Sequence, residues 1–273
     1  MNYNNRITKR HPGLIIFMVD QSGLGMLDGE TGTSLAEFAA TIVNICITEM
    51  VNIATKPVGE YDEEVQDYFY IYIWGYGGDY NNNVNLLYQG FISDVAYNNP
   101  YEDVGPFHII QVVKPVVGYD SPMATAFEKV RECIVDWKNN GHNGEDEVSP
   151  LIINVTHGEI LFEQVGNSKN DIYMSARSII EISFPDGPPL ICNIITSKKD
   201  SEDTPSFENQ ICRRETFQQL LSSISSSPTD RMYGFEKKKL LFNVNDVYDL
   251  NFFDYLVFSW GGSYAKPPHL RLR

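Results

Sequence analysis

Residues 12–20 read PGLIIFMVD and carry the strongest fold signal in the chain. All six residues from Leu14 to Val19 are apolar, and the run ends at Asp20. A strand with one solvated face alternates apolar and polar residues, whereas a parallel strand that is covered on both faces is apolar throughout. The run therefore predicts a central parallel strand, near residues 13–20, with both faces buried.

Strand and helix patterns alternate along the rest of the chain. Further strands are predicted near residues 67–76, 151–156 and 190–196, and KKLLFNV (238–244) is predicted to form a late strand or a turn. Helices are predicted near residues 34–55, 121–138, 169–181 and 208–224, with a helix or mixed segment in 245–260. This alternation is typical of a parallel sheet that is covered by helices on both faces. We therefore expect an α/β fold with a doubly wound, mostly parallel, Rossmann-like sheet.

The segment 84–117 is the least regular part of the chain. NLLYQGFIS (85–93) and FHIIQVVKPVV (107–117) are predicted strands, separated by a stretch rich in Asn, Pro and Gly. We expect them to add an antiparallel edge to the sheet. The predicted domain spans residues 12–260, between an N-terminal arm, residues 1–11, and a C-terminal tail, residues 261–273.

Polar residues mark the expected helix starts. Thr33 or Ser34 can cap the first helix, with Glu37 in its first turn. Ser121 can cap the helix near 121–138, because Pro122 fits the first turn of a helix. Both starts agree with the apolar periodicity that follows them.

Composition excludes several functional classes. The 273 residues carry a formal net charge of −15, which repels phosphate backbones, so no nucleic-acid partner is expected. The polar N-terminus lacks the apolar core of a signal peptide, and the apolar runs fall short of a membrane span. No cysteine pair has metal-binding spacing. We expect a cytoplasmic protein with no membrane partner and four free cysteines: Cys46, Cys133, Cys192 and Cys212.

Three predicted loops carry polar residues. Two of them directly follow the strands at 13–20 and 151–156, and the third directly precedes the helix near 121–138. In open α/β sheets, ligands bind beyond the carboxyl ends of the strands. The three candidate loops are Asp20-Gln21-Ser22, Tyr119-Asp120-Ser121-Pro122 and Thr156-His157-Gly158-Glu159.

Five motifs in order, DQSGLGM, WGYG, LYQG, SPMA and THGE, resemble those of the von Willebrand factor A domain. The likeness is closest to a bacterial intracellular branch that is often encoded beside kinases and phosphatases. It covers nearly the whole chain, because FQQLLSSISSSP and LLFNVND also fit. The resemblance implies the doubly wound fold and a protein-binding role without catalysis.

In that family the three loops hold a Mg²⁺ ion, the metal-ion-dependent adhesion site, whose open position accepts a carboxylate of the partner. The resemblance assigns Asp20, Ser22 and Ser121 to the metal. Leu24 stands where the family has a second serine, and His157 stands where it has an aspartate. Leucine offers no lone pair, and neutral imidazole is a poor Mg²⁺ ligand. We therefore expect a degenerate site, no resident cofactor and at most weak Mg²⁺ binding.

The resemblance implies a binding module in a bacterial multi-protein system for signalling, stress response or phage defence. The expected partner is another protein, such as a kinase, a phosphatase or an AAA+ ATPase encoded nearby. The residues expected to contact it are Gln21, Leu24, Asp120, His157 and Glu159.

Two other interpretations of the loops stay open. In the first, the chain is a metal-assisted α/β hydrolase, and the reacting groups are Asp20, Asp120, His157 and Glu159. In the second, the residues have only structural roles. Asp20 and Ser22 would then form a turn by bonding nearby backbone, and His157 would be hydrogen-bonded to a neighbour.

Overall fold

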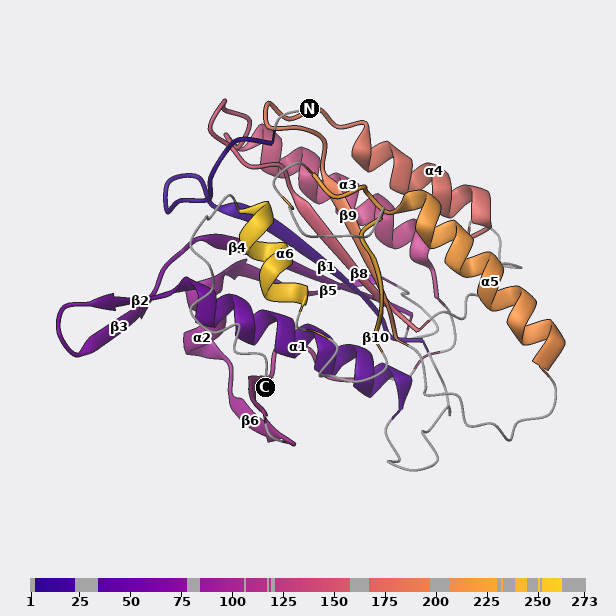
Figure 1. Cartoon of the computed structure of the whole chain (residues 1–273), viewed down its shortest axis with the longest axis horizontal. Helices are drawn as coiled ribbons and strands as arrows, with labels where there is room; N and C mark the ends of the chain where they lie inside the picture. The colour runs from indigo at the N-terminus through magenta and orange to yellow at the C-terminus, as the bar shows by residue number, and fades with distance from the viewer. Residues whose placement is uncertain are drawn as a thin grey trace.

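A six-stranded sheet runs through the middle of the molecule (Figure 1). Its strands are β1 (Gly13–Asp20), β4 (Phe69–Tyr76), β5 (Val84–Phe91), β8 (Leu151–Thr156), β9 (Leu190–Thr196) and β10 (Leu241–Val244). They lie in the order β10-β9-β8-β1-β4-β5, and only β4 and β5 pair antiparallel. If these six strands are numbered 1 to 6 in sequence order and read from β5 to β10, the order is 3-2-1-4-5-6. This is the strand order of a doubly wound sheet. The predicted fold class, including the antiparallel edge, is confirmed.

The structure is a computed structural model. It describes residues 3–22, 34–77, 84–105, 107–116, 118, 121–157, 167–196, 207–229, 232, 239–244, 250 and 252–261. The side chains of residues 207–215 and 255 lie outside this description. The predicted site residues Leu24, Asp120 and Glu159, and the tail from residue 262 onward, also lie outside the described residues.

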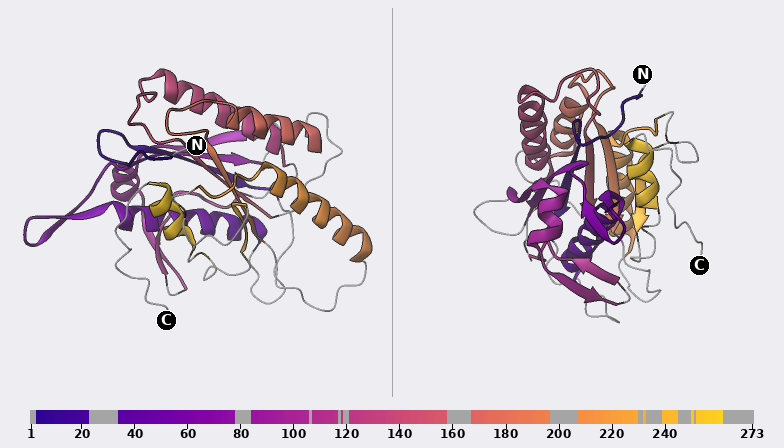
Figure 2. Two further views of the ribbon diagram at one scale, coloured as in Figure 1. Left: turned by 45° about the horizontal axis from the view of Figure 1, so that its top comes forward. Right: turned by 90° about the vertical axis from the view of Figure 1, so that its left-hand side faces the viewer.

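Helices cover both faces of the sheet (Figure 2). One layer consists of α1 (Leu35–Ala54), α2 (Ile92–Asn98) and α6 (Phe252–Trp260). The other consists of α3 (Met123–Asn139), α4 (Lys169–Ile180) and α5 (Phe207–Ile224). Strand β1 supplies both cores, since Ile15 and Phe17 face the first layer whereas Leu14 and Ile16 face the second. This is why its sequence is apolar without alternation.

Most predicted elements are confirmed to within two residues. The strands at 13–20, 151–156 and 190–196 have the predicted bounds, and β4 begins two residues after the predicted start at 67. The start of α1 is also confirmed: Ser34 is its N-cap, and its hydroxyl accepts from Glu37 N (3.1 Å). Glu37 in turn accepts from Ser34 N (2.6 Å), which completes a capping box.

The predicted second strand of the edge, 107–117, is confirmed only at residues 107–110, and that strand does not join the main sheet. Only β6 (Tyr101–Val104) and β7 (Phe107–Ile110) pair there, as a hairpin separate from the main sheet, and Ile92 and Ser93 begin α2. The backbone N–H groups of Val112 and Val113 donate to the side chain of Asn44 in α1 (3.1 and 2.9 Å). Because a helix side chain satisfies these donors, the segment after β7 runs along α1 instead of joining the sheet.

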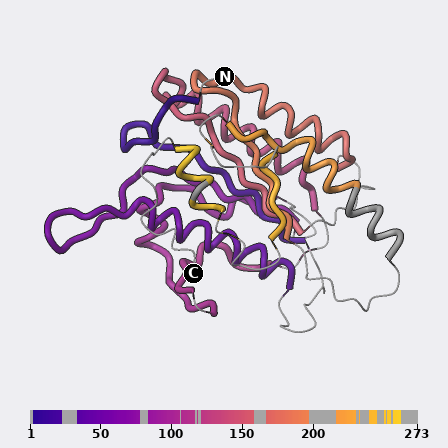
Figure 3. Tube along the Cα trace, viewed as in Figure 1, coloured from indigo at the N-terminus to yellow at the C-terminus, as the bar shows by residue number. Residues whose placement is uncertain are grey.

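Two segments extend the basic architecture. The hairpin of β2 (Thr55–Val58) and β3 (Asp62–Val65) projects from the body at the end of α1 (Figures 1 and 2). Figure 3 traces the N-terminal arm beside the C-terminal end of α6, where Ile7 N donates to Gly261 O (3.1 Å). The described part of the arm, residues 3–11, is therefore docked on the domain.

Helix α1 corrects one expectation about apolar runs. It is 20 residues long and, among the described helices, apolar enough by length and composition to cross a membrane. However, 67% of its most apolar window is buried inside the folded chain, and core helices pass the same test. The apolar run therefore reaches the length of a span, but its side chains pack against the sheet.

Candidate functional site

The candidate site lies at the carboxyl ends of β1 and β8, the two neighbouring strands at which the strand order reverses direction. Asp20 is the last residue of β1, Thr156 is the last residue of β8, and His157 follows directly. Ser22 leaves β1 and forms an isolated parallel bridge with Gly118, which brings the segment before α3 to the same edge. The fold therefore brings together Asp20, Ser22, Ser121 and His157, as predicted from the sequence.

The carboxylate of Asp20 is fully buried, and both its oxygens accept hydrogen bonds from this chain. Oδ1 accepts from the Ser22 backbone N–H (3.1 Å) and the Ser22 hydroxyl (2.6 Å). Oδ2 accepts from the hydroxyls of Thr156 (2.9 Å) and Ser121 (3.2 Å). A buried charge costs several kcal/mol unless such donors compensate for lost water, so these donors hold the carboxylate in its ionised form.

Opposing effects act on the pKa of Asp20. Burial, the largest single effect, raises the pKa because it removes water from the charged form. The interaction with His157 and the hydrogen bonds from Ser22 and Thr156 lower it, and together they outweigh burial. The pKa of Asp20 therefore lies below its ordinary value.

The imidazole of His157 completes the cluster. Its Nε2 lies 2.9 Å from Ser22 Oγ and 3.4 Å from Asp20 Oδ1. The Ser22 hydroxyl donates its only proton to Asp20, so the contact with Ser22 requires a proton on Nε2. A Ser-His-Asp triad places the serine and the carboxylate on opposite ring nitrogens. Here both contact Nε2, so this geometry does not prepare Ser22 as a nucleophile.

The second loop corrects the expected cap of α3. The N-cap is Pro122, without a side-chain hydrogen bond, and Ser121 is directed to Asp20 instead. Asn167, which lies far away in sequence, takes the capping role that was expected of Ser121. Its Oδ1 accepts from Ala124 N (3.2 Å), and its Nδ2 donates to Ser121 O (2.7 Å). Asn167 therefore both stabilises the helix start and positions Ser121, a role that the sequence around 121 does not reveal.

Gln21 was predicted to contact a partner, but its side chain is buried, with 4% of the residue exposed. It lies over Gly75 of β4, where any added Cβ would collide with Gln21 Oε1. Glycine at this strand position therefore makes room for the turn after β1. His157 is also buried, so neither residue presents a free surface in the described structure.

A chain of buried polar residues leads away from Asp20 and was not predicted. The Tyr76 hydroxyl donates to Asn154 Oδ1 (2.9 Å), and Asn154 Nδ2 donates to Asn193 Oδ1 (2.8 Å). Burial, followed by the charge of Asp20, raises the pKa of Tyr76 well above its ordinary value, so the hydroxyl stays protonated. Asn154 and Asn193 interrupt otherwise apolar strand sequences at paired register positions, which is the signal that could have found them.

The donor set does not fit the Mg²⁺ site implied by the family resemblance. Both oxygens of Asp20 are already acceptors within the chain, and the Ser22 oxygen faces an imidazole N–H. Mg²⁺ needs several oxygens with free lone pairs to replace its water shell. The cluster instead provides an imidazole where a cation would neutralise Asp20.

Comparison with known proteins adds no family assignment. The sequence matches no protein-family model, and no curated protein matches it. The hydrolase hypothesis also stays a prediction, because two of its four groups, Asp120 and Glu159, lie outside the described residues.

Proposed function

We propose that this chain is a protein-binding domain of the von Willebrand factor A type that holds its partner without a bridging metal ion. Its setting would be a bacterial multi-protein system for signalling, stress response or defence. The state of Asp20 carries the proposal: the carboxylate is buried and saturated by Ser22, Ser121 and Thr156. A carboxylate held in this way supports neither metal-bridged capture of a partner nor acid–base catalysis on a substrate.

The position of the cluster supports a binding role for the loops above it. Ligands of doubly wound sheets bind at the switch point, where the loops after neighbouring strands diverge. Asp20 and its partners join the described ends of three of these loops, at Ser22, Ser121 and Thr156. Val116, which precedes the bridge at Gly118, places an exposed apolar side chain near this edge.

The negative charge of the chain favours a partner that has a basic surface. A net charge of −15 attracts a partner with a basic surface and disfavours acidic ones. A kinase, a phosphatase or an AAA+ ATPase encoded nearby is the partner that we propose. The attraction mainly speeds association, so the rate of binding should fall as salt is added.

Calorimetric titration with Mg²⁺ and Mn²⁺ tests the metal-free part of the proposal. We expect no sub-millimolar binding to the natural chain. The double variant Leu24→Ser with His157→Asp restores a ligand oxygen and a negative charge, and it should bind either ion. Adding Asp20→Ala to that variant should abolish the new binding. Sub-millimolar binding by the natural chain that Asp20→Ala removes would overturn this part.

Affinity purification from the native host tests the binding surface. Val116→Arg places a charge beside the proposed face, whereas Val58→Arg places one on the distant hairpin at a similarly exposed residue (42% and 48% exposed). We expect the first variant to lose a specific partner that the second retains, and a chelator to have no effect. Equal retention by both variants, or release of the partner by the chelator, would contradict the proposal.

A further inference from the structure

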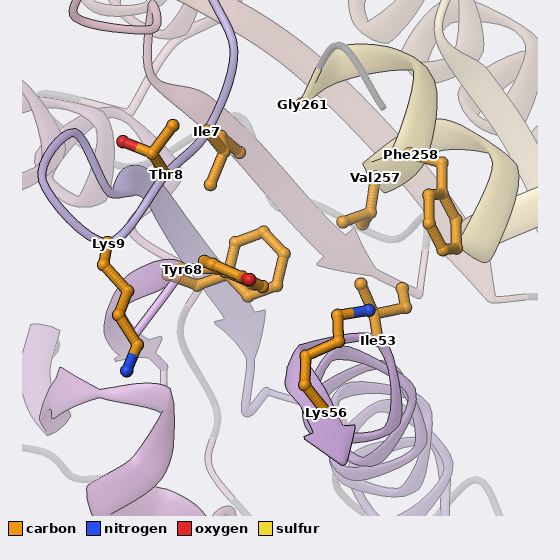
Figure 4. Close-up of a pocket in the computed structure, with 10 residues that line it drawn as sticks. Ile7, Thr8, Lys9, Ile53, Lys56, Tyr68, Val257, Phe258 and Gly261 are labelled. Atoms are coloured by element: carbon orange, nitrogen blue, oxygen red, sulfur yellow. The ribbon is translucent and has the colours of Figure 1, made fainter. Parts of the chain in front are cut away.

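A pocket of about 340 Å³ lies at the amino end of the sheet, opposite the end that holds Asp20 (Figure 4). The N-terminal arm, the end of α1, the start of β4 and the end of α6 all contribute to its wall. Its apolar lining includes Ile7, Ile53, Phe69, Val257 and Phe258. The volume falls within the range, roughly 300–1,000 Å³, of small-molecule sites.

The wall of this pocket is held in place by packing. Phe69 and Val257 belong to the buried core of the α1 layer. The arm is fixed by Ile7 N, which donates to Gly261 O, and by close packing over Gly13. A Cβ added at Gly13 would lie 2.6 Å from both Ile7 Cδ1 and Trp260 Cη2. The pocket is therefore formed before any ligand arrives, which lowers the entropy cost of binding.

The rim of the pocket is cationic in an otherwise acidic protein. Lys9 and Lys56 both line it and are exposed, and within the described residues neither forms an ion pair. Glu64 lies opposite Lys56 in the β2–β3 register, and its carboxylate accepts from the neutral Gln66 Nε2 (2.8 Å), so it keeps its negative charge beside the rim. Figure 4 shows the Lys56 nitrogen beside Ile53, turned toward the apolar side chains of the pocket, whereas the Lys9 nitrogen points away from them.

Two features of the rim define the charge of a ligand. Two ammonium groups beside an apolar wall attract an anion that has an apolar body. The C-terminal ends of α1 and α6 also lie here, and the partial negative charge of helix C-termini disfavours a dianion more strongly than a singly charged anion. A singly charged carboxylate satisfies both conditions better than a phosphate. Tyr68, which also lines the pocket, offers a hydroxyl as a further donor.

We propose that this pocket binds a medium-chain aliphatic carboxylate. The chain would pack against Ile7, Ile53 and Phe258, with the carboxylate beside Lys56. The volume of about 340 Å³ favours a medium chain, because a long-chain fatty acid or a phospholipid needs more room. The site is separate from the proposed protein-binding face and does not depend on it.

Titration of the full chain with octanoate, followed by calorimetry and by the methyl NMR signals of Ile7 and Ile53, tests the proposal. We expect octanoate to bind and to shift both signals. Octanol lacks the charge and acetate lacks the chain, so each should bind at least about tenfold more weakly. Inorganic phosphate should leave both methyl signals in place.

Variants of the rim test the role of the lysines. Lys56→Gln should weaken octanoate binding about fivefold, and the double variant with Lys9→Gln should weaken it further. Lys114→Gln, at an exposed lysine outside the pocket, should leave the affinity unchanged. Because all three lysines are exposed, the variants should keep the melting temperature of the natural chain.

Three outcomes would overturn the proposal. The first is octanoate that shifts neither methyl signal at millimolar concentration. The second is equal affinity for octanol and octanoate, which would remove the role of charge. The third is unchanged octanoate affinity in the double variant of Lys9 and Lys56, which would place the carboxylate elsewhere.

Discussion

At the scale of single residues, Asp20 shows how hydrogen bonds from the same chain can stabilise a buried, ionised carboxylate. Three hydroxyls and one backbone N–H donate to it, and the imidazole of His157 lies 3.4 Å away. These donors come from three separate segments of the chain. The carboxylate is therefore a junction that ties β1, β8 and the segment before α3 together, and its loss should be felt as lost stability.

Asp20→Asn should lower the free energy of unfolding at neutral pH by about 2–4 kcal/mol, because the amide cannot accept at both positions. The pKa of Asp20 is lowered in the folded state, so its stabilisation is present above the unfolded pKa and is lost as pH falls through the folded pKa. Urea unfolding at several pH values should show the two chains converging under acidic conditions. A constant difference between them down to the lowest pH would contradict the assignment.

Asp254 in α6 has the opposite shift. Burial, followed by the charge of Glu49 on α1, raises its pKa to about 6. A raised acid contributes stability below the unfolded pKa and loses it as pH rises through the folded value. Asp254→Asn should therefore stabilise the fold by roughly 1 kcal/mol above pH 6, after allowance for its partial exposure, and by little under acidic conditions. Thermal unfolding of Glu49→Gln should give a smaller gain with the same pH trend, and destabilisation of both variants at alkaline pH would refute the pairing.

At the scale of elements, helix α1 organises one face of the molecule through polar as well as apolar contacts. Its apolar residues pack on the sheet, whereas Asn44 and Thr48 receive the backbone N–H groups of Ile110, Val112 and Val113. Because these backbone N–H groups are hydrogen-bonded to the helix, the segment after β7 cannot use them to pair with a strand of the sheet. Strand propensity in residues 111–116 was therefore overridden by hydrogen bonds from Val112 and Val113 to a side chain that lies 68 and 69 residues away in sequence.

The start of α1 offers a direct test of a locally encoded feature. Ser34→Ala removes the hydroxyl that accepts from Glu37 N and should cost about 1 kcal/mol of unfolding free energy. Ser175→Ala, inside α4, is the matched control, because alanine is favoured over serine in helix interiors. Equal losses in both variants, measured by denaturant unfolding, would show that the capping box contributes nothing specific.

At the scale of the whole molecule, two hydrophobic cores lie on opposite faces of one sheet, and the three described cysteines are buried in them. Cys46, Cys133 and Cys192 are buried and form no disulfide, whereas the side chain of Cys212 lies outside the described residues. Burial raises the pKa of Cys133 to about 11 and that of Cys46 well above its ordinary value. Thiols with such pKa values carry little reactive thiolate at neutral pH.

Thiol titration under non-reducing conditions checks this picture. In denaturant all 4 cysteines should react, because the sequence predicts that none of them forms a disulfide. In the native state Cys46, Cys133 and Cys192 should react far more slowly, at a rate limited by opening of the fold. Two or no reactive thiols in denaturant would contradict free cysteines, and fast native labelling of all of them would contradict the packing.

The periodicity of apolar residues along the sequence was enough to predict the strands and helices of the sheet, because burial of a strand or helix face imposes a periodicity on consecutive residues. The apolar run of β1, the cap at Ser34 and the position of Asp20 at a carboxyl end were all predicted in this way. The co-location of Asp20, Ser22, Ser121 and His157 also followed, since the carboxyl ends of parallel strands meet at one edge.

Only the tertiary structure decided what those side chains contact. Ser121 donates to Asp20 across 101 residues and Thr156 does so across 136, and Asn167 takes over the cap that Ser121 was expected to provide. The pocket between the arm, α1 and α6 likewise joins segments that no local pattern connects. Hydrogen-bond partners and cavities depend on distances between remote segments, whereas periodicity depends on neighbours along the chain, so the first cannot be derived from the second.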